Sequence, residues 1–362
     1  MGAQNSVHAG KAKIDYNVDL THKIFAPLLV PHLRHSSSNP LSLVIGRLCI
    51  KHPDLFGGNE KLDISWDKGL FDSNVLIAVR RPRQDCLARQ SFIIQHSIAP
   101  EIGLQGPQID ISSRLQWGNI HLCRLSAGMD INEPASSNWI STTSIKLEHV
   151  RPLNDEGRSV SRDIDGFPIT CSGGSHDNMV VLKQESQYAV VNDSSFSKLN
   201  LQMEQGIPVL SKWLIFNKFK FVASSGVKLG PAFLLTSLTG GSIVGDLAPY
   251  QAFKIGGLGS VRGYGDGAIS SGRSFLVVNG ELTIPLAKRL EGALFMDFGT
   301  DLGSAHHVPG NPALRQGKSG HGFGLGSGLR LNSQVGQIQL DYAVNNLLRT
   351  TIYFGVAVPS HR

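Results

Sequence analysis

The chain has 362 residues, a formal net charge of +6, 41% hydrophobic residues and only 17% charged residues. Soluble chains usually carry about 25% charged residues and about 7% glycine, whereas this chain has 40 glycines. No stretch reaches the roughly 20 apolar residues of a membrane-spanning helix, because Pro27, Pro31 and the pair Arg80 and Arg81 interrupt the longest candidates. The absence of a glycine period and of sustained heptads also excludes collagen and coiled coil.

The distribution of charge and the spacing of the cysteines argue against a nucleic-acid-binding protein and against a zinc site. Lys and Arg are spread along the chain without a basic run, so the sequence predicts no nucleic-acid partner. The four cysteines, Cys49, Cys86, Cys123 and Cys171, are more than 30 residues apart and show no CxxC spacing. They are interpreted as unpaired thiols without zinc.

The N-terminal residues carry no secretory signal or organellar transit pattern. Gly2 and Ser6 match the minimal myristoylation pattern, which is short and often met by chance. Residues 1–11 are expected to form a short segment before the first strand.

Apolar residues recur at every second position along most of the chain. Leu199, Leu201 and Met203, for example, alternate with polar residues, which is typical of a strand with one apolar and one polar face. The pattern predicts about sixteen strands, near 12–20, 41–50, 61–66, 75–80, 91–99, 119–128, 140–149, 178–187, 196–205, 213–222, 226–237, 274–283, 291–299, 321–331, 335–342 and 350–357.

The lengths of the strands and of their connections favour a membrane barrel. Most predicted strands have the roughly 9 to 11 residues that cross a bilayer when tilted, and long connections alternate with short ones, as in outer-membrane barrels. A pair of soluble β-sandwiches or a propeller would also show alternating strands, but with shorter strands and without this alternation of loops. The predicted fold is therefore all-β, a transmembrane antiparallel β-barrel of about sixteen strands over residues 12–357, whose longest loop spans 238–273.

Three motifs follow one another in and after this loop. Val261, Arg262, Gly263 and Tyr264 form the sequence VRGY. The next strand ends in Glu-x-x-x-Pro, from Glu281 to Pro285, and the one after it carries F-x-D-x-G with Phe295, Asp297 and Gly299. In this order the motifs resemble the BamA/FhaC superfamily of outer-membrane barrels, which assemble other barrels or translocate polypeptides. The match is close over residues 250–357, including the Gly-rich strand at 322–331, and elsewhere rests on strand pattern and length.

The resemblance implies that the long loop folds into the barrel before strand 12 and that Arg262 pairs with Asp297 on the inner wall. The chemistry supports this pairing, because a guanidinium inside a narrow lumen needs a carboxylate that accepts its fork of donors. Glu281 and Asp297, which might suggest paired catalytic carboxylates, are instead interpreted as lumen-facing partners of Arg262. Gly263 would let the backbone bend beside the pair.

The chain departs from the family at its start, where predicted strands begin near residue 12 and leave no room for a POTRA module. It looks like the short, POTRA-less outer-envelope members of plant plastids, since a bacterial barrel would need a secretion signal. The resemblance implies a chloroplast outer-membrane protein that contacts membrane lipid and assists protein assembly or transport, with a POTRA-bearing relative and polypeptide clients as partners. A passive ion or metabolite pore, with Lys146, Lys198, Lys218 and Lys220 in the lumen, and a barrel of structural value only remain open.

Other constellations point to no enzyme, cofactor or metal. Lys318 and Ser319 end like a nucleotide-binding P-loop, but Pro312 stands where the first glycine is required and a strand follows. His306, His307 and His321 lack regular ligand spacing. Aromatic residues near strand ends are expected to form interfacial girdles: Trp66, Trp139, Trp213, Tyr250, Tyr342, Tyr353 and Phe354.

Overall fold

The computed structural model describes residues 44–52, 60–69, 72–81, 89–106, 118–133, 138–311, 317–332 and 337–357. The strand predicted at 12–20, the segment 1–11 with Gly2, and Cys86 lie outside these residues. The described part of the chain contains no helix with the length and apolar composition of a membrane span.

One antiparallel sheet of fifteen strands contains most of the described residues. Neighbours in sequence are neighbours in the sheet, from β1 to β10 and then from β13 to β17. The strands are β1 (Val44–His52), β2 (Lys61–Gly69), β3 (Ser73–Arg81), β4 (Arg89–Gly106), β5 (Gly118–Asn132), β6 (Trp139–Leu153), β7 (Asp177–Val191), β8 (Ser195–Ile207), β9 (Phe216–Leu229), β10 (Ala232–Gly245), β13 (Ser274–Ala287), β14 (Leu290–Thr300), β15 (His321–Asn332), β16 (Gln337–Asn345) and β17 (Thr350–Ala357).

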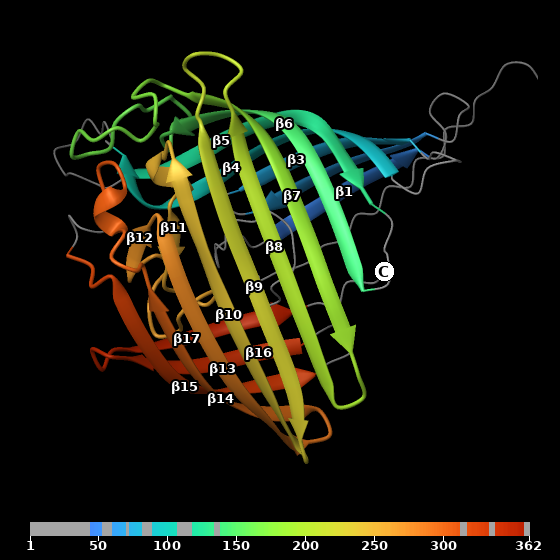
Figure 1. Cartoon of the computed structure of the whole chain (residues 1–362). Coiled ribbons are helices and arrows are strands. Elements are labelled where there is room, and N and C mark those ends of the chain that lie inside the picture. Colours follow the sequence, from blue (N-terminus) through green and yellow to red (C-terminus); the bar gives the residue numbers. More distant parts are fainter. Residues whose placement is uncertain are drawn as a thin grey trace, which may run out of the picture.

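The sheet curls around a lumen into an open barrel (Figure 1). Among the described strands, β1 and β17 each pair on one side only and form its two edges. The prediction of an antiparallel all-β barrel is confirmed, and each predicted strand from 41–50 onward overlaps a strand of this sheet.

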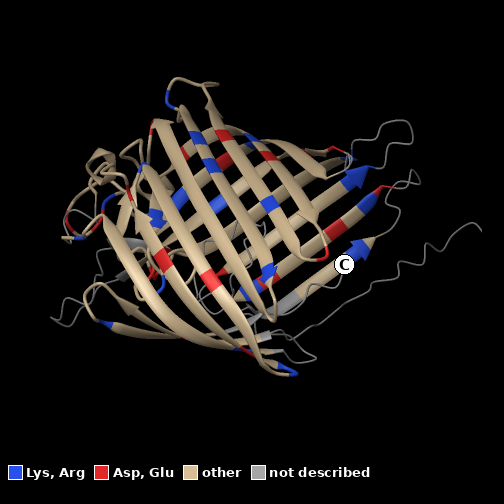
Figure 2. Ribbon diagram, turned by 60° about the horizontal axis from the view of Figure 1, so that its bottom comes forward, with Lys and Arg blue, Asp and Glu red and all other residues tan. Residues whose placement is uncertain are grey.

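The alternation of side chains follows the predicted pattern. In β14, Phe295 and Asp297 face inward and are buried, whereas Leu294, Met296 and Phe298 face outward and are exposed. A strand alternates its side chains in this way because successive residues point to opposite faces. Charged positions interrupt long uncharged stretches of the strands (Figure 2), as expected for a wall with lipid on one side.

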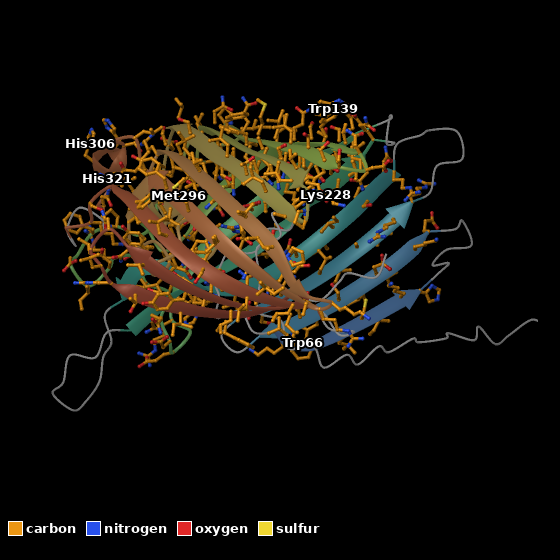
Figure 3. The ribbon with its side chains drawn as sticks, turned by 90° about the horizontal axis from the view of Figure 1, so that it is seen from below. Trp66, Trp139, Lys228, Met296, His306 and His321 are labelled. Atoms are coloured by element: carbon orange, nitrogen blue, oxygen red, sulfur yellow. The ribbon has the colours of Figure 1, made fainter. Side chains whose placement is uncertain are left out.

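The two rims differ in the length of their connections. Short turns join β7 to β8, β9 to β10 and β13 to β14, whereas residues 154–176, 246–273 and 301–320 form long connections at the opposite rim, here called the long-loop rim. Figure 3 shows His306 and His321 near this rim and Trp139 and Lys228 near the other.

The predicted boundaries were wrong at one hairpin. The sequence suggested a turn at 223–225, but β9 continues to Leu229 and β10 to Gly245. Gly226, which the sequence placed at the start of the strand 226–237, lies within β9 beneath the rings of Phe196 and Phe233, where any side chain would collide with them. The long loop therefore spans residues 246–273 and not 238–273.

Candidate functional site

The loop between β10 and β13 folds into the lumen. It contains a short 3-10 helix, η1 (Pro249–Gln251), and a two-stranded ribbon of β11 (Phe253–Ile255) and β12 (Ser270–Gly272), which lies inside the curve of the sheet (Figure 1). Residues 246–273, here called the lumen loop, bury the apolar side chains of Ile255, Val261 and Ile269 completely. A surface loop would not bury such side chains, so the barrel wall must hold it.

Arg262 of the lumen loop binds Asp297 of β14. The guanidinium donates from Nε to Oδ2 at 2.7 Å and from Nη2 to Oδ1 at 3.0 Å, and the backbone N–H of Arg262 donates to Oδ2 at 3.1 Å. Both side chains are buried. A fork of two parallel bonds fixes direction as well as distance, so this pair sets the position of the loop on the wall.

Phe295 of β14 and Asn279 of β13 make further contacts with the Arg262–Asp297 pair. The guanidinium carbon of Arg262 lies 3.5 Å from the centre of the Phe295 ring, a cation–π contact. Asn279 of β13 donates both to Asp297 Oδ1 at 2.9 Å and to the carbonyl of Ser260 at 2.6 Å. One amide thus binds both the wall and the loop.

Glu281 joins this pair to a second arginine. Its Oε2 accepts from Arg262 Nη1 at 2.6 Å, and its Oε1 accepts from Arg330 Nη2 at 3.0 Å. Arg330 also binds Asp341 of β16, which lies 3.6 Å from Arg262. Burial by itself would lower the pKa of Arg262, but the hydrogen bonds and charge of Asp297, together with the charge of Glu281, outweigh burial and raise it. The guanidinium of Arg262 therefore stays charged throughout the physiological pH range.

The next two loop residues bind the last two strands. The hydroxyl of Tyr353 accepts from the N–H of Gly263 at 2.9 Å and donates to the carbonyl of Tyr264 at 2.7 Å. Asn345 donates to the carbonyl of Gly263 at 2.9 Å, and the Tyr264 hydroxyl donates to Asn346 at 2.5 Å. The VRGY sequence thus connects β14 to β16 and β17.

A row of glycines in β15 makes space for the loop. Gly322, Gly324, Gly326 and Gly328 alternate along the strand and so share its inner face. A Cβ at Gly324 would lie 1.9 Å from the carbonyl oxygen of Arg262, and one at Gly322 would collide with Ile269 and Tyr264. The loop therefore rests on bare backbone of the wall.

The structure brings the four VRGY residues, Glu281, Phe295, Asp297 and Gly299 into one cluster, here called the latch, whereas Pro285 at the end of the Glu-x-x-x-Pro motif is exposed and lies outside it. Val261 packs where a side chain at Gly299 would collide with it, and the other six make the contacts described above. Sequence reasoning missed Arg330, Asp341 and Asn345 as members of this cluster. Arg330 stands near the end of the Gly-rich strand that belongs to the family match, and that match was the available signal for it, whereas the strand of Asp341 and Asn345 carries no short motif.

A second attachment of the lumen loop lies on the opposite wall. Lys254 of β11 forms a partly buried ion pair with Glu101 of β4, and Lys218 of β9 lies 5.1 Å from the centre of the Phe253 ring. Lys318, the residue of the P-loop-like sequence, donates to the carbonyl of Gly267 at 2.8 Å. The loop therefore spans the lumen from β4 to β14.

Replacing Glu101 by glutamine is expected to lower the free energy of unfolding by about 1–3 kcal/mol, because the partly buried amine of Lys254 loses its carboxylate partner. Urea titration of the refolded barrel measures the effect. Glu156→Gln serves as the control, since its pair with Arg158 is exposed and such pairs contribute about 1 kcal/mol or less. Equal urea midpoints for the two variants would show that the ion pair of Lys254 and Glu101 does not stabilise the barrel.

Two apolar clusters fill the lumen at the long-loop rim. In one, Ala248 and Tyr250 of the loop pack against Ile120, Met179 and Phe216. In the other, the ribbon and the VRGY segment pack against β10 and β13. The loop is thus a plug with an apolar interior and not a strap across an open hole.

Two aromatic residues expected in the interfacial girdles turn inward instead. Tyr250 is buried and its hydroxyl donates to Asp177 at 3.0 Å, and Tyr353 binds the loop backbone. Burial of Tyr250 raises its pKa well above the ordinary value, and the charge of Asp177 adds to this. Trp66, Trp139, Tyr342 and Phe354 have exposed side chains.

The inner wall beyond the plug carries opposite charges in pairs. Lys146 lies 3.0 Å from Asp130, and Lys218 lies 4.0 Å from Glu204. Lys198 and Lys220 share this inner face by strand alternation. The lumen below the plug is therefore polar and mixed in sign.

Among the described residues, no group of three potential metal ligands comes together. Cys49, Cys123 and Cys171 are free thiols.

The fold and the latch define a class of protein, the outer-membrane β-barrels with an inward-folded, arginine-anchored loop. Residues 55–357 match the Omp85 superfamily domain, and the chain belongs to the Omp85 superfamily. It is 65% identical over 356 residues to outer envelope protein 39 of the chloroplast from Arabidopsis thaliana, covering 98% of each chain. The chain is therefore a β-barrel protein of the chloroplast outer envelope.

More distant similarities agree with this assignment. Outer envelope protein 80 of the Arabidopsis thaliana chloroplast is 38% identical over 325 residues, which cover 89% of this chain and 44% of that relative. The crystal structure of BamA from Haemophilus ducreyi lacking POTRA domains 1–3 superposes with a TM-score of 0.60 at 15% identity, covering 86% of this chain and 65% of that one. At this identity the likeness concerns the fold.

Proposed function

We propose that this barrel handles polypeptides, assisting their assembly into the chloroplast outer membrane or their transport across it. The observation that carries the proposal is the latch. Arg262 is held by a fork to Asp297 in a buried network, and the loop that it anchors fills the lumen. A permanently open pore has no use for such a plug, whereas a barrel that admits a polypeptide needs a closed resting state.

The geometry favours a loop with discrete positions. The bonds of Arg262 break together if the loop leaves the wall, because a guanidinium cannot stay buried without its carboxylates. The bare backbone of β15 would then face the lumen. The proposal assigns no catalytic residue, and all work is done by binding and displacement.

The partners belong to the proposal. We expect polypeptide clients, a POTRA-bearing relative that presents them and membrane lipid around the wall, and no nucleotide. Capture of such a relative from envelope membranes by the tagged barrel would support this part. Normal client assembly after loss of that contact would count against it.

The second candidate, a passive pore for ions or metabolites, rests on the basic positions of the inner wall. Lys146 and Lys218 are each paired with a carboxylate, so such a pore would show only mild anion preference. The apolar clusters of the plug oppose it, since they occupy the lumen at the long-loop rim.

Single-channel recording in planar bilayers tests the proposal. The wild type is expected to show a small, unsteady conductance, and Arg262→Ala a larger one, because the loop loses its anchor. Arg273→Ala is the matched control, since Arg273 ends the same loop but is only partly buried, and its guanidinium donates to the backbone carbonyls of His307 and Gly245. A wide, steady wild-type conductance that Arg262→Ala leaves unchanged would contradict the plug and favour the passive pore.

A further inference from the structure

Leu302 occupies a turn position that leucine normally avoids. It follows β14 with a φ of 52°, and Gly303 after it has a φ of 72°. The N–H of Ser304 donates to the carbonyl of Asp301 at 2.9 Å and closes the turn. Two central residues with positive φ are typical of a type I′ turn, which prefers Asn, Asp or Gly.

Leu348 repeats this exception in the hairpin between β16 and β17. The N–H of Leu348 donates to the carbonyl of Asn345 at 3.0 Å, and the N–H of Asn345 donates to the carbonyl of Arg349 at 3.0 Å. Leu348 has a φ of 57°. In such three-residue loops the left-handed position usually holds glycine.

Both leucines are also exposed. Leu302 is 59% exposed and Leu348 is 85% exposed, and the adjacent Leu347 is 64% exposed. Leu302 and Leu348 are the only residues other than glycine with positive φ among the described residues. A left-handed leucine in water is unfavourable twice, through its backbone and through its apolar surface. Strain of this kind indicates a position where the side chain has a use.

The leucines stand where the lipid-facing surface of the barrel ends. Both loops follow even-numbered strands and lie at the long-loop rim. Leu302 continues the outward row of Leu294, Met296 and Phe298 on β14, and Leu348 precedes the exposed Ile352 and Phe354 of β17. The position is continuous with the surface that already contacts the bilayer.

The inner side of these loops is already occupied. Asn345 and Asn346, which start the β16–β17 turn, bind Gly263 and Tyr264 of the lumen loop. Leu347 and Leu348 therefore have no place in the lumen and point away from it.

We propose that Leu302, Leu347 and Leu348 form a lipid anchor that inserts into the boundary between headgroups and acyl chains and fixes the depth of the β14–β17 side of the barrel. Leu302 and Leu348 keep a left-handed backbone with their side chains exposed, and insertion would bury the apolar surface of all three leucines in the membrane boundary. This anchor is independent of the proposed handling of polypeptides.

Site-directed fluorescence locates the side chains. In a variant whose four cysteines are serine, a polarity-sensitive dye is attached at Leu302→Cys or Leu348→Cys, with Ser175→Cys in the exposed 154–176 loop as the aqueous control. In liposomes of envelope lipids, nitroxides near the headgroup should quench the dye at 302 and 348, and a water-soluble quencher should act several-fold more weakly there than at 175. Quenching from water only would overturn the anchor. Protection from both quenchers would place a second copy of the chain on the leucines and would overturn it as well.

A second variant separates lipid contact from backbone strain. Asparagine tolerates the left-handed conformation better than leucine, so the double variant Leu302→Asn with Leu348→Asn relieves the turns while removing the apolar side chains. The anchor predicts a lower urea midpoint than wild type in liposomes. A midpoint that is equal or higher would mean that these positions carry strain without lipid contact, and would overturn the proposal.

Discussion

Asp297→Ala is expected to release the lumen loop and to lower the free energy of unfolding by about 3–5 kcal/mol, the usual cost of breaking a buried ion pair. Asp297 accepts three hydrogen bonds from Arg262, and no water can replace them because both side chains are buried. Urea titration measures the loss of stability, and trypsin cleavage after Arg262 or Lys254 reports the release of the loop.

The double variant Arg262→Ala with Asp297→Ala provides the control. Removing both partners leaves no unpaired guanidinium in the wall, so the double variant should unfold at higher urea than Asp297→Ala alone. If Asp297→Ala unfolds like the wild type and its loop resists trypsin, the latch does not hold the loop.

Gly324→Ala is expected to expel the loop while every charge of the latch stays in place. The added methyl group would lie 1.9 Å from the carbonyl oxygen of Arg262, and backbone cannot move aside as a flexible side chain can. Overpacking of this kind costs about 3 kcal/mol. The expected results are rapid trypsin cleavage within 246–273 and a larger conductance.

Gly280→Ala is the matched control for this experiment. Gly280 lies in β13, where the nearest atom to an added Cβ, the carbonyl oxygen of Met296, is 3.9 Å away. This variant should keep its loop and its stability. Equal trypsin cleavage of the two variants would show that the loop does not pack against the glycine row of β15.

The strands could be predicted from the sequence because each carries the alternation of a wall between lipid and lumen. The hairpin of β9 and β10 could not be placed, since residues 223–225 were predicted to form a turn although they lie within β9. What keeps Gly226 in the strand is the pair of rings from β8 and β10 that cover it. This contact exists only after the three strands have paired.

The attachment of the lumen loop could be predicted only in part, because local motifs mark one of its two ends and not the other. Arg262 and Asp297 stand in short motifs whose order is visible in the chain. Glu101, which binds Lys254, lies 153 residues away from it in a strand without any motif. Glu101 contacts the loop because the sheet curves and brings β4 opposite it. Local sequence patterns do not predict this curvature.

The attachment of the lumen loop to the last hairpin has a consequence for how the barrel is made. Gly263 and Tyr264 bind residues that come 82 to 90 residues later in the chain. While β16 and β17 are missing, the loop has no partner for these bonds, and only its contacts with the earlier strands can hold it. The last hairpin therefore completes the attachment of the loop, and a chain truncated before Asn345 would keep the partner of Arg262 in β14 but lose the contacts of Gly263 and Tyr264.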